Sequence, residues 1–259
     1  MMQAKILRTT IAKQSIAQAK ELAPPFKTEL KPGTYDILQW DYTAAGHQKV
    51  TFAQPIANYQ TWIIWGDDIE CEGEEKQIRL RVPYYSQRDN LEDPSRTCST
   101  SSHAMVLNFL KPGSVASDDE YFRKFVKPYG PKASTNWDVH TTALQQFGIK
   151  SVYRQNLDFA DLERSLELGY PVAIGVLHKG TLATPEGGHV LVIVGMDKAR
   201  GIFYANDPWG EGFKYTNLNG EGVEYPINPS LDRRWMPDGH GSGWGRLITA
   251  IDGKPTGLV

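Results

Sequence analysis

The hydrophobic pattern of the chain changes at residues 71–77, and this change divides the chain into two parts that must fold differently. Before it, short runs rich in aromatic and β-branched residues are separated by Pro, Gly, Asn and Ala, at 31–40, 47–52 and 60–70. Val50 and Phe52 alternate with polar neighbours, the period of two that is typical of a strand with one buried face. Several short strands in so short a stretch predict a small β-barrel or sandwich.

The change itself falls on the sequence CEGEEKQ, which is acidic, polar and contains a glycine, as linkers often are. We therefore predict an all-β domain over residues 1–72 and a second domain over residues 73–259. Residues 3–22 remain ambiguous, since their propensity favours a helix while a Thr-Thr-Ile cluster would suit a first strand and a loop.

After the linker, helical patterns come first and strands follow. Apolar residues at helical spacing predict helices at 98–110 and 136–147, and after the candidate N-caps Ser117 and Asp158. Three apolar runs then predict strands at 171–177, 189–196 and 201–207. Helices that precede strands, rather than alternating with them, indicate an α+β fold.

Composition excludes several classes of function for this chain of 259 residues. The formal charge of −2 gives no basic surplus for binding nucleic acid. Two cysteines, with no CxxC or HExxH spacing, favour neither a disulfide framework nor a metal site, so we expect no cofactor. No apolar run approaches the roughly 20 residues of a membrane span. Lysines and glutamines stand near the start where a signal peptide would be apolar, so we expect the chain to be made in the cytoplasm.

Cys98 lies where a loop meets the first predicted helix of the second domain. A thiol there feels the positive end of the helix dipole and unpaired backbone N–H groups, which both favour the thiolate. The small residues that follow it would let another element approach closely. The alternative is a buried cysteine that acts as a small hydrophobic residue, the commoner case for a free thiol.

A histidine and an acid lie on neighbouring predicted strands. His189 follows two glycines and opens an apolar strand, and Asp207 ends the next strand. A short turn between these strands predicts an antiparallel hairpin, which would return the chain near Asp207 to the side of His189. Either Asn206 or Asp207 could orient the imidazole, and we favour Asp207. The order Cys, His, Asp suits nucleophilic thiol catalysis, in which a base holds the thiolate and a third group fixes the base.

A glutamine upstream of the cysteine could complete such a site. Gln87 stands in the segment RVPYYSQRDN, and its amide could donate to a developing oxyanion together with the Cys98 backbone N–H. A loop glutamine on the surface is the alternative. The remaining histidines have weaker claims, because neither His140 nor His178 has the Gly-Gly approach or an acid on a paired strand.

Five blocks occur in one order over about residues 78–210: VPYYSQRDN, CSTSSHAMVLNFL, DLERSLELGYPVAIGV, GGHVLVIVGMD and FYANDPWG. Together they resemble the papain-like cysteine peptidases of the double-glycine, bacteriocin-processing type. The resemblance implies a papain-like α+β fold with Cys98 as nucleophile, His189 as base, Asp207 as orienting acid and Gln87 as oxyanion donor. Many relatives have Cys-Gly-Pro-Thr where this chain has Cys-Ser-Thr-Ser, a change that bears on substrate preference more than on catalysis.

The first domain resembles the bacterial SH3-like domains of phage endolysins, through GHQKVTF and TWIIWGDDIE. That resemblance implies binding to the cell wall through exposed aromatic residues, for which Trp62 and Trp65 are candidates. Both could instead fill the core of a barrel, which we favour for Trp62. Trp209, two residues after Asp207, is a third candidate substrate-binding residue.

These observations predict a cysteine endopeptidase that cleaves amide bonds in the peptide bridges of peptidoglycan and acts at the bacterial wall after release from the cell. The partner is then a peptide or peptidoglycan, without nucleic acid or membrane insertion. One alternative is a processing peptidase that cuts a leader peptide after small residues. Another is a non-catalytic virion or wall-binding protein that keeps the peptidase fold as a scaffold.

Overall fold

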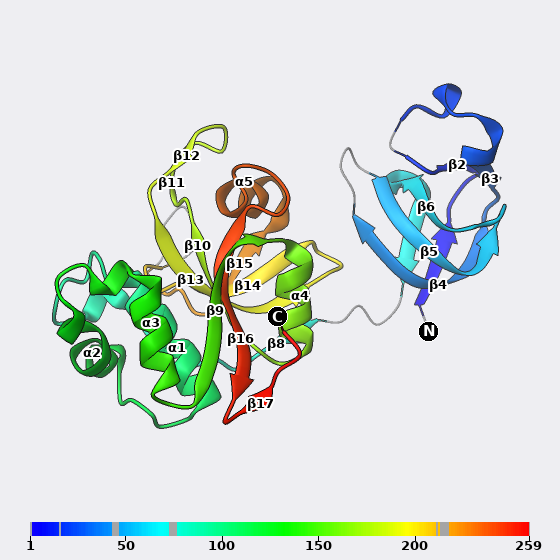
Figure 1. Cartoon of the computed structure of the whole chain (residues 1–259). Coiled ribbons are helices and arrows are strands. Elements are labelled where there is room, and N and C mark those ends of the chain that lie inside the picture. Colours follow the sequence, from blue (N-terminus) through cyan, green and yellow to red (C-terminus); the bar gives the residue numbers. More distant parts are fainter. Residues whose placement is uncertain are drawn as a thin grey trace. The chain divides into compact units, whose positions relative to one another are not determined.

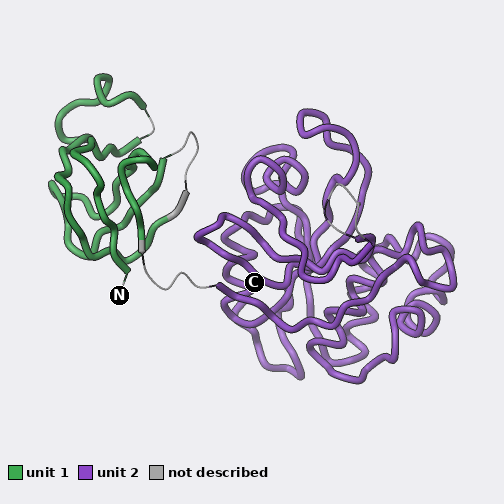
Figure 2. Tube along the Cα trace, turned by 180° about the vertical axis from the view of Figure 1, so that it is seen from behind, with its two compact units in different colours: residues 1–76 green, residues 77–259 purple. Residues whose placement is uncertain are grey.

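The chain forms two compact units, Met1–Lys76 and Gln77–Val259 (Figures 1 and 2). The computed structural model describes residues 2–15, 17–42, 47–72, 77–210, 212 and 218–258. The division falls four residues after the predicted one at 72/73, and residues 73–76 of the predicted linker lie outside the described part.

The first unit is built from one antiparallel sheet in the order β3-β2-β6-β5-β4-β1-β7. Its strands are β1 (Met2–Ile6), β2 (Thr10–Lys13), β3 (Lys27–Leu30), β4 (Gly33–Tyr42), β5 (His47–Ile56), β6 (Tyr59–Trp65) and β7 (Ile69–Glu72). Residues 3–22 therefore contain strands β1 and β2, which agrees with the strand-and-loop alternative rather than with a helix. Within the described residues no β3–β7 pairing closes the sheet into a barrel, and the SH3-like assignment stays a prediction.

Trp62 lies in the core of this unit and is not an exposed binding residue. Its side chain has no exposed surface, and its indole N–H donates to the carbonyls of Ile56 and Tyr59 at 3.2 and 3.1 Å. The assignment of Trp62 to substrate binding is therefore corrected, because the alternating pattern of β6 turns this ring inward. Trp65, three residues on, is 42% exposed, and its indole donates to the Asp67 carboxylate at 3.3 Å.

The second unit is a mixed α and β structure around an eight-stranded antiparallel sheet. Its helices are α1 (Cys98–Leu110), α2 (Asp118–Tyr121), α3 (Trp137–Gln145), α4 (Phe159–Glu167) and α5 (Asp232–Trp235). Its strands are β8 (Ile78–Arg79), β9 (Ile149–Leu157), β10 (Val172–Val176), β11 (Lys179–Gly180), β12 (Pro185–Glu186), β13 (His189–Asp197), β14 (Ile202–Asn206), β15 (Val223–Pro226), β16 (Gly243–Ile251) and β17 (Lys254–Pro255). The main path of the sheet is β15-β14-β13-β10-β16-β17, with β8 paired to β13 and β9 to β16, while β11 and β12 form a separate hairpin.

Strand β13 is the centre of this unit because it is buried on both faces, which explains its continuous apolar sequence. Val190, Val192 and Val194 belong to the core that packs against α1 and α3. Leu191 and Ile193 belong to the core on the opposite face, which packs against α4 and α5. The sheet therefore lies between two helical layers (Figure 1).

The structure confirms most of the elements predicted for this unit and differs from the prediction at a helix cap and at strand β9. Helix α1 spans the predicted residues, and β13 pairs antiparallel with β14 as expected. Asp158 caps α4 in a full capping box, whereas Ser117 caps α2 without the reciprocal bond, since the Glu120 carboxylate accepts from Ala116 N–H. Strand β9 between α3 and α4 breaks the predicted order of helices before strands.

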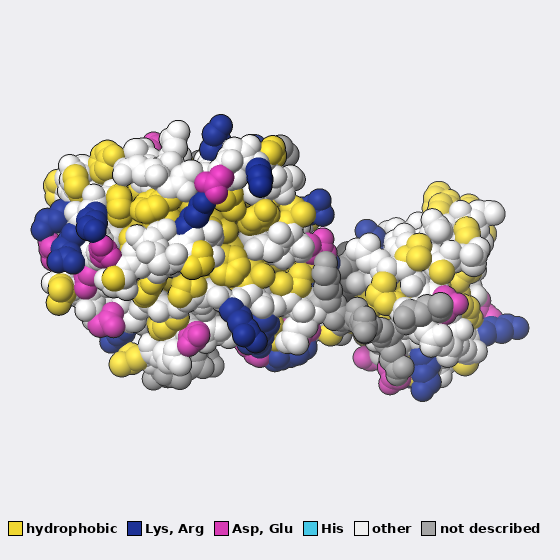
Figure 3. All heavy atoms as spheres, turned by 90° about the horizontal axis from the view of Figure 1, so that it is seen from below, with side chains coloured by type: hydrophobic (Ala, Val, Ile, Leu, Met, Phe, Trp, Pro, Cys, Tyr) yellow, Lys and Arg dark blue, Asp and Glu magenta, His cyan; other side chains and the backbone are white. Residues whose placement is uncertain are grey.

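Two features of the described residues bear on function classes. None of the described helices is long and apolar enough to cross a membrane. On the face of unit 2 drawn in Figure 3, lysines and arginines lie interspersed with acidic side chains rather than gathered in one basic patch.

Candidate active site

Cys98 is the first residue of α1, and the start of this helix keeps its backbone donors uncapped. The N-cap residue Thr97 makes no side-chain cap, because its hydroxyl is hydrogen-bonded at 2.9 Å to the side-chain amide of Asn90. The first N–H groups of a helix have no intrahelical acceptor and carry the positive end of its dipole. Cys98 is half-buried and therefore lies at a place that favours a thiolate.

His189 and Asp207 form a buried pair. The Nε2 atom of His189 lies 2.7 Å from Asp207 Oδ1, and the two side chains are 5% and 0% exposed. A carboxylate only accepts, so Nε2 carries the proton, and the other ring nitrogen, Nδ1, is the one available to the thiol. Asn206 points elsewhere: its amide donates to the Val82 carbonyl at 3.1 Å and accepts from the Gly222 N–H at 3.0 Å.

The charges of these groups are coupled. Burial by itself lowers the pKa of His189, but the charge and hydrogen bond of Asp207 and the contact with Cys98 raise it to about 10. Burial likewise raises the pKa of the Cys98 thiol, but the hydrogen bond and charge of His189, with backbone N–H groups of Val190 and Ser99, bring the pKa below its ordinary value. Both shifts favour a thiolate–imidazolium pair near neutral pH.

Asp207 is held on several sides. Its Oδ1 also accepts from the Trp209 N–H at 2.8 Å, and its Oδ2 accepts from the Tyr225 hydroxyl at 2.5 Å. Its backbone carbonyl accepts from the Tyr84 hydroxyl at 3.1 Å. These donors compensate for the burial of a charged group, which would otherwise be costly.

Gln87 lies in the same pocket as Cys98 and His189. Its backbone N–H donates to the Pro208 carbonyl at 2.9 Å, and its Nε2 donates to the Pro94 carbonyl at 2.7 Å. The side chain is 2% exposed, and its Oε1 has no hydrogen-bond partner among the described residues. The amide nitrogen carries two hydrogens, so one remains after the bond to Pro94.

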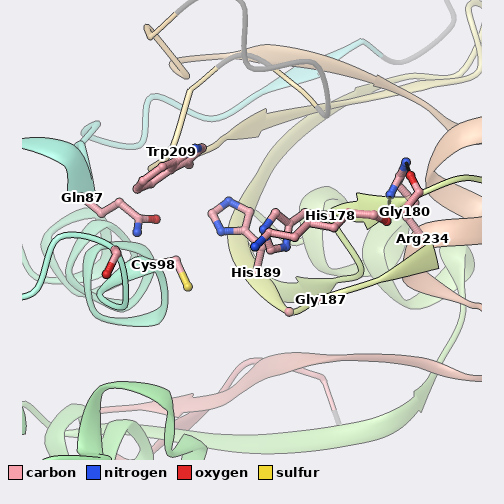
Figure 4. Close-up of a pocket in the computed structure, with 11 residues that line it drawn as sticks. Gln87, Cys98, His178, Gly180, Gly187, His189, Trp209 and Arg234 are labelled. Carbon is pink, nitrogen blue, oxygen red and sulfur yellow. Dashed lines mark hydrogen bonds between the residues drawn. The ribbon is translucent and has the colours of Figure 1, made fainter.

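An open pocket of about 700 Å³ contains these side chains (Figure 4). Trp209 forms one wall, with the Arg88 guanidinium 4.6 Å from its ring centre. Ser95, from the loop before α1, also lines the pocket, and the other lining residues come from the region of β11 and β12 and from α5: His178, Lys179, Gly180, Gly187, Gly188 and Arg234. Arg234 supports this region, since its guanidinium donates to the carbonyls of Leu177, Lys179 and Gly180 at 2.7, 2.8 and 3.2 Å.

The structure thus brings together Gln87, Cys98, His189 and Trp209 at one pocket, with Asp207 directly behind His189. Trp62 and Trp65 belong to the other unit. His178 lines the pocket with its ring centre 5.3 Å from that of His189, but burial and the nearby charge of His189 lower its pKa to about 4. No cluster of His, Cys, Asp or Glu that could hold a metal ion is found in the described part of the chain.

The sequence alone does not identify Tyr225 and Arg234 as neighbours of the site. Tyr225 follows Asp207 by 18 residues and lies on a different strand. Arg234 stands in a short helix whose sequence, DRRW, reads as a charged surface turn, yet its side chain is 7% exposed. Only the pairing of β14 with β15 and the position of α5 bring them to the pocket.

Comparison with known proteins gives the family. None of the curated proteins matches the chain. Among solved structures, the chain is similar to a putative C39-like peptidase from Bacillus anthracis, with 16% identity, a TM-score of 0.47, and 68% of this chain and 99% of that chain covered. It is also similar to a double glycine motif protease from an AMS/PCAT transporter, solved with a leader peptide, with 17% identity, a TM-score of 0.41, and 67% of this chain and 97% of that chain covered. A third similar structure is the cysteine protease xylellain from Xylella fastidiosa, with 16% identity, a TM-score of 0.39, and 68% of this chain and 86% of that chain covered. Residues 79–225, more than half of the chain, match the model of the Peptidase_C39 like family, and the chain therefore belongs to this family and is a cysteine peptidase.

Proposed function

We propose that the protein is a cysteine endopeptidase in which Cys98, His189 and Asp207 form the catalytic triad and Gln87 assists at the oxyanion. The observation that carries this proposal is the 2.7 Å contact between His189 Nε2 and Asp207 Oδ1, with Cys98 at the uncapped start of α1 in the same pocket. A base held by an acid beside a thiol is the arrangement that activates a nucleophile.

The reaction follows from these positions. The Cys98 thiolate attacks the amide carbonyl and forms a C–S bond, while the carbonyl electrons move to the oxygen. The Cys98 backbone N–H and the second N–H of Gln87 Nε2 donate to this oxyanion. Protonated Nδ1 of His189 gives its proton to the leaving amine as the C–N bond breaks. Water then attacks the thioester with His189 as base, which releases the acid and restores the thiol.

The substrate that we propose is the peptide part of bacterial peptidoglycan, with the site of action at the cell wall after release. Support comes from a separate all-β unit that presents an exposed aromatic residue, Trp65, as wall-binding modules do. The glycines at the pocket, Gly187 and Gly188, leave room for an extended peptide chain beside His189.

The two cysteines allow a matched test. Purified cell wall should lose turbidity and gain free amines with the wild type and with Cys71→Ala, while Cys98→Ala should lose at least about 1,000-fold in rate. Gln87→Ala should lose about 100- to 1,000-fold. Activity that survives Cys98→Ala would refute the assignment of the nucleophile. Cleavage of glycine-terminated peptides without any action on cell wall would favour the leader-processing alternative.

Thiol chemistry tests the ion pair without any substrate. At about pH 6, Cys98 should react with iodoacetamide much faster than Cys71, because it is a thiolate at a pH where ordinary thiols are protonated. His189→Ala should remove this difference. Equal and slow labelling of both cysteines in the wild type would favour the scaffold alternative.

A further inference from the structure

The carboxylate of Asp207 has a contact that the catalytic sequence above does not use. The hydroxyl of Tyr225 donates to Asp207 Oδ2 at 2.5 Å, on the side of the carboxylate opposite the one that faces His189. Tyr225 is 1% exposed and Asp207 is fully buried, so water does not replace this donor.

The sheet sets this contact. Strand β15 pairs antiparallel with β14, with Tyr225 opposite Phe203, near the start of β14. The long side chain of Tyr225 reaches from there to Asp207, which follows the other end of β14. The backbone of Asp207 is fixed independently, by its N–H to the Gly220 carbonyl at 2.8 Å and its own carbonyl to Tyr84. What these backbone bonds leave undetermined is the rotation of the carboxylate.

We infer that Tyr225 is a positioning residue. Its hydroxyl fixes the rotation of the Asp207 carboxylate so that Oδ1 accepts from His189, and the same hydroxyl stabilises the carboxylate as an anion. This inference rests on the proposed function, since Tyr225 acts through Asp207 on the catalytic base. A charge-assisted hydrogen bond to a buried anion is among the stronger ones in proteins. Its removal leaves Oδ2 buried without this donor, so that only the contacts of Oδ1 with the Trp209 N–H and His189 restrain the rotation of the carboxylate.

The role has a specific signature in pH dependence. The titratable groups that face His189 are Cys98 from α1, Asp207 after β14 and His178 after β10, and Asp207 is also in contact with Tyr84. The thiolate–imidazolium pair is present between two ionisations, which form the acid and alkaline limbs of its dependence on pH. The acid limb is the ionisation of Cys98, before and after which His189 is protonated. The alkaline limb is the loss of the proton from His189, which the Asp207 anion opposes. A weakened Asp207 therefore moves the alkaline limb and leaves the acid limb in place.

The experiment compares Tyr225→Phe with Tyr204→Phe in the full-length protein. Tyr204 is a matched control: it lies in the neighbouring strand, is fully buried, and its hydroxyl accepts from the Gln77 amide at 3.1 Å and contacts Asp197, away from the pocket. Tyr225→Phe should lower kcat by about 10- to 100-fold with KM within about 2-fold. The pKa of His189, followed by NMR of its ring in the absence of substrate, should fall by about one unit from its raised value, the counterpart of a tenfold loss. Tyr204→Phe should change neither.

A double-mutant cycle separates positioning from loss of structure. In an Asp207→Asn background, the further change Tyr225→Phe should have no effect on the titration of His189, because the group through which Tyr225 acts is gone. Equal shifts in both backgrounds, or a Tyr225→Phe variant in which the pKa of His189 does not move, would overturn the inference. Because the titration of His189 needs no substrate, failure of the proposed function is a separate result: it would show as a wild type that cleaves neither cell wall nor peptide, or as a Cys98→Ala variant that still cleaves.

Discussion

Acid should destabilise the peptidase unit through two histidines that lie away from the pocket. His103 and His140 are fully buried and stacked, with ring centres 4.1 Å apart and planes at 3°. Nε2 of His140 lies 3.1 Å from the Ser134 carbonyl, and its Nδ1 lies 3.2 Å from the Tyr121 hydroxyl. His103 accepts from Arg246 Nε at 2.8 Å and lies 2.7 Å from the Ser99 carbonyl. Both rings are therefore neutral, since Arg246 donates to the second nitrogen of His103 and the Tyr121 hydroxyl can donate to that of His140.

The size of the effect follows from the shift in pKa. Burial lowers the pKa of His140 from 6.5 to about 3, so the unfolded chain binds a proton that the folded chain refuses. This contribution to stability is complete above pH 6.5 and is lost as the pH falls toward 3. Between pH 7 and pH 5, His140 alone should lower the free energy of unfolding by about 2 kcal/mol. His103, whose pKa burial also lowers well below 6.5, adds to the loss in the same direction.

The assay is urea unfolding at pH 7 and pH 5 followed by the helical circular dichroism, which the α-helices of unit 2 dominate in the described residues. His140→Gln keeps a donor near Ser134 but does not titrate. The wild type should lose about 2 kcal/mol more than this variant between the two pH values. The exposed His240, changed to Gln, should behave as the wild type. A difference between wild type and His140→Gln that is the same at both pH values would refute the reasoning.

Further substitutions test a pocket glycine, the two tryptophans of unit 1 and a helix cap. Gly187 has φ +76°, and a Cβ there would lie 3.1 Å from the His178 ring, so Gly187→Ala should lower kcat/KM for a cleaved peptide by about 10-fold or more. Trp62→Ala should destabilise unit 1 by about 3–5 kcal/mol in urea. Trp65→Ala should cost less than about 1 kcal/mol and weaken cosedimentation with cell wall. Asp158→Ala removes the capping box of α4 and should cost about 1 kcal/mol, seen by calorimetry as a fall of roughly 2–4 °C in the Tm of unit 2.

Much of the fold was predictable where the signal is local. The continuous apolar sequence of β13, the small residues after Cys98 and the N-cap Asp158 each determine a structure within a few residues. Strand β9 was missed because its burial is only partial over most of its length, so no clear period of two appears. Strand β16 was missed because two glycines and a buried arginine, Arg246, make it resemble a surface loop.

In the site, too, features with a local sequence signal could be predicted, and those that depend on strand pairing could not. Gly-Gly-His and Asp-Pro are local patterns, and a short turn joins their strands, so His189 and Asp207 could be placed together from the sequence. Tyr225 could not, because its contact depends on the pairing of β14 with β15, and residues 211 and 213–217 between these strands lie outside the described part. A tyrosine in a strand reads as a core residue until the register shows which polar atom its hydroxyl meets.

The histidines of unit 2 show why residue type alone does not give a role. His189 and His140 are both buried, yet Asp207 holds one as a cation while burial, with the charge of Arg246, lowers the pKa of the other and keeps it neutral. The two therefore respond to acid in opposite ways: acid favours the protonated form of His189 and opposes the folded form around His140. We accordingly expect the free energy of unfolding of unit 2 to fall between pH 7 and pH 5 while His189 stays protonated. Parallel measurement of urea unfolding and of the His189 ring by NMR against pH tests this, and a neutral His189 in this range, or a free energy of unfolding that stays constant, would contradict it.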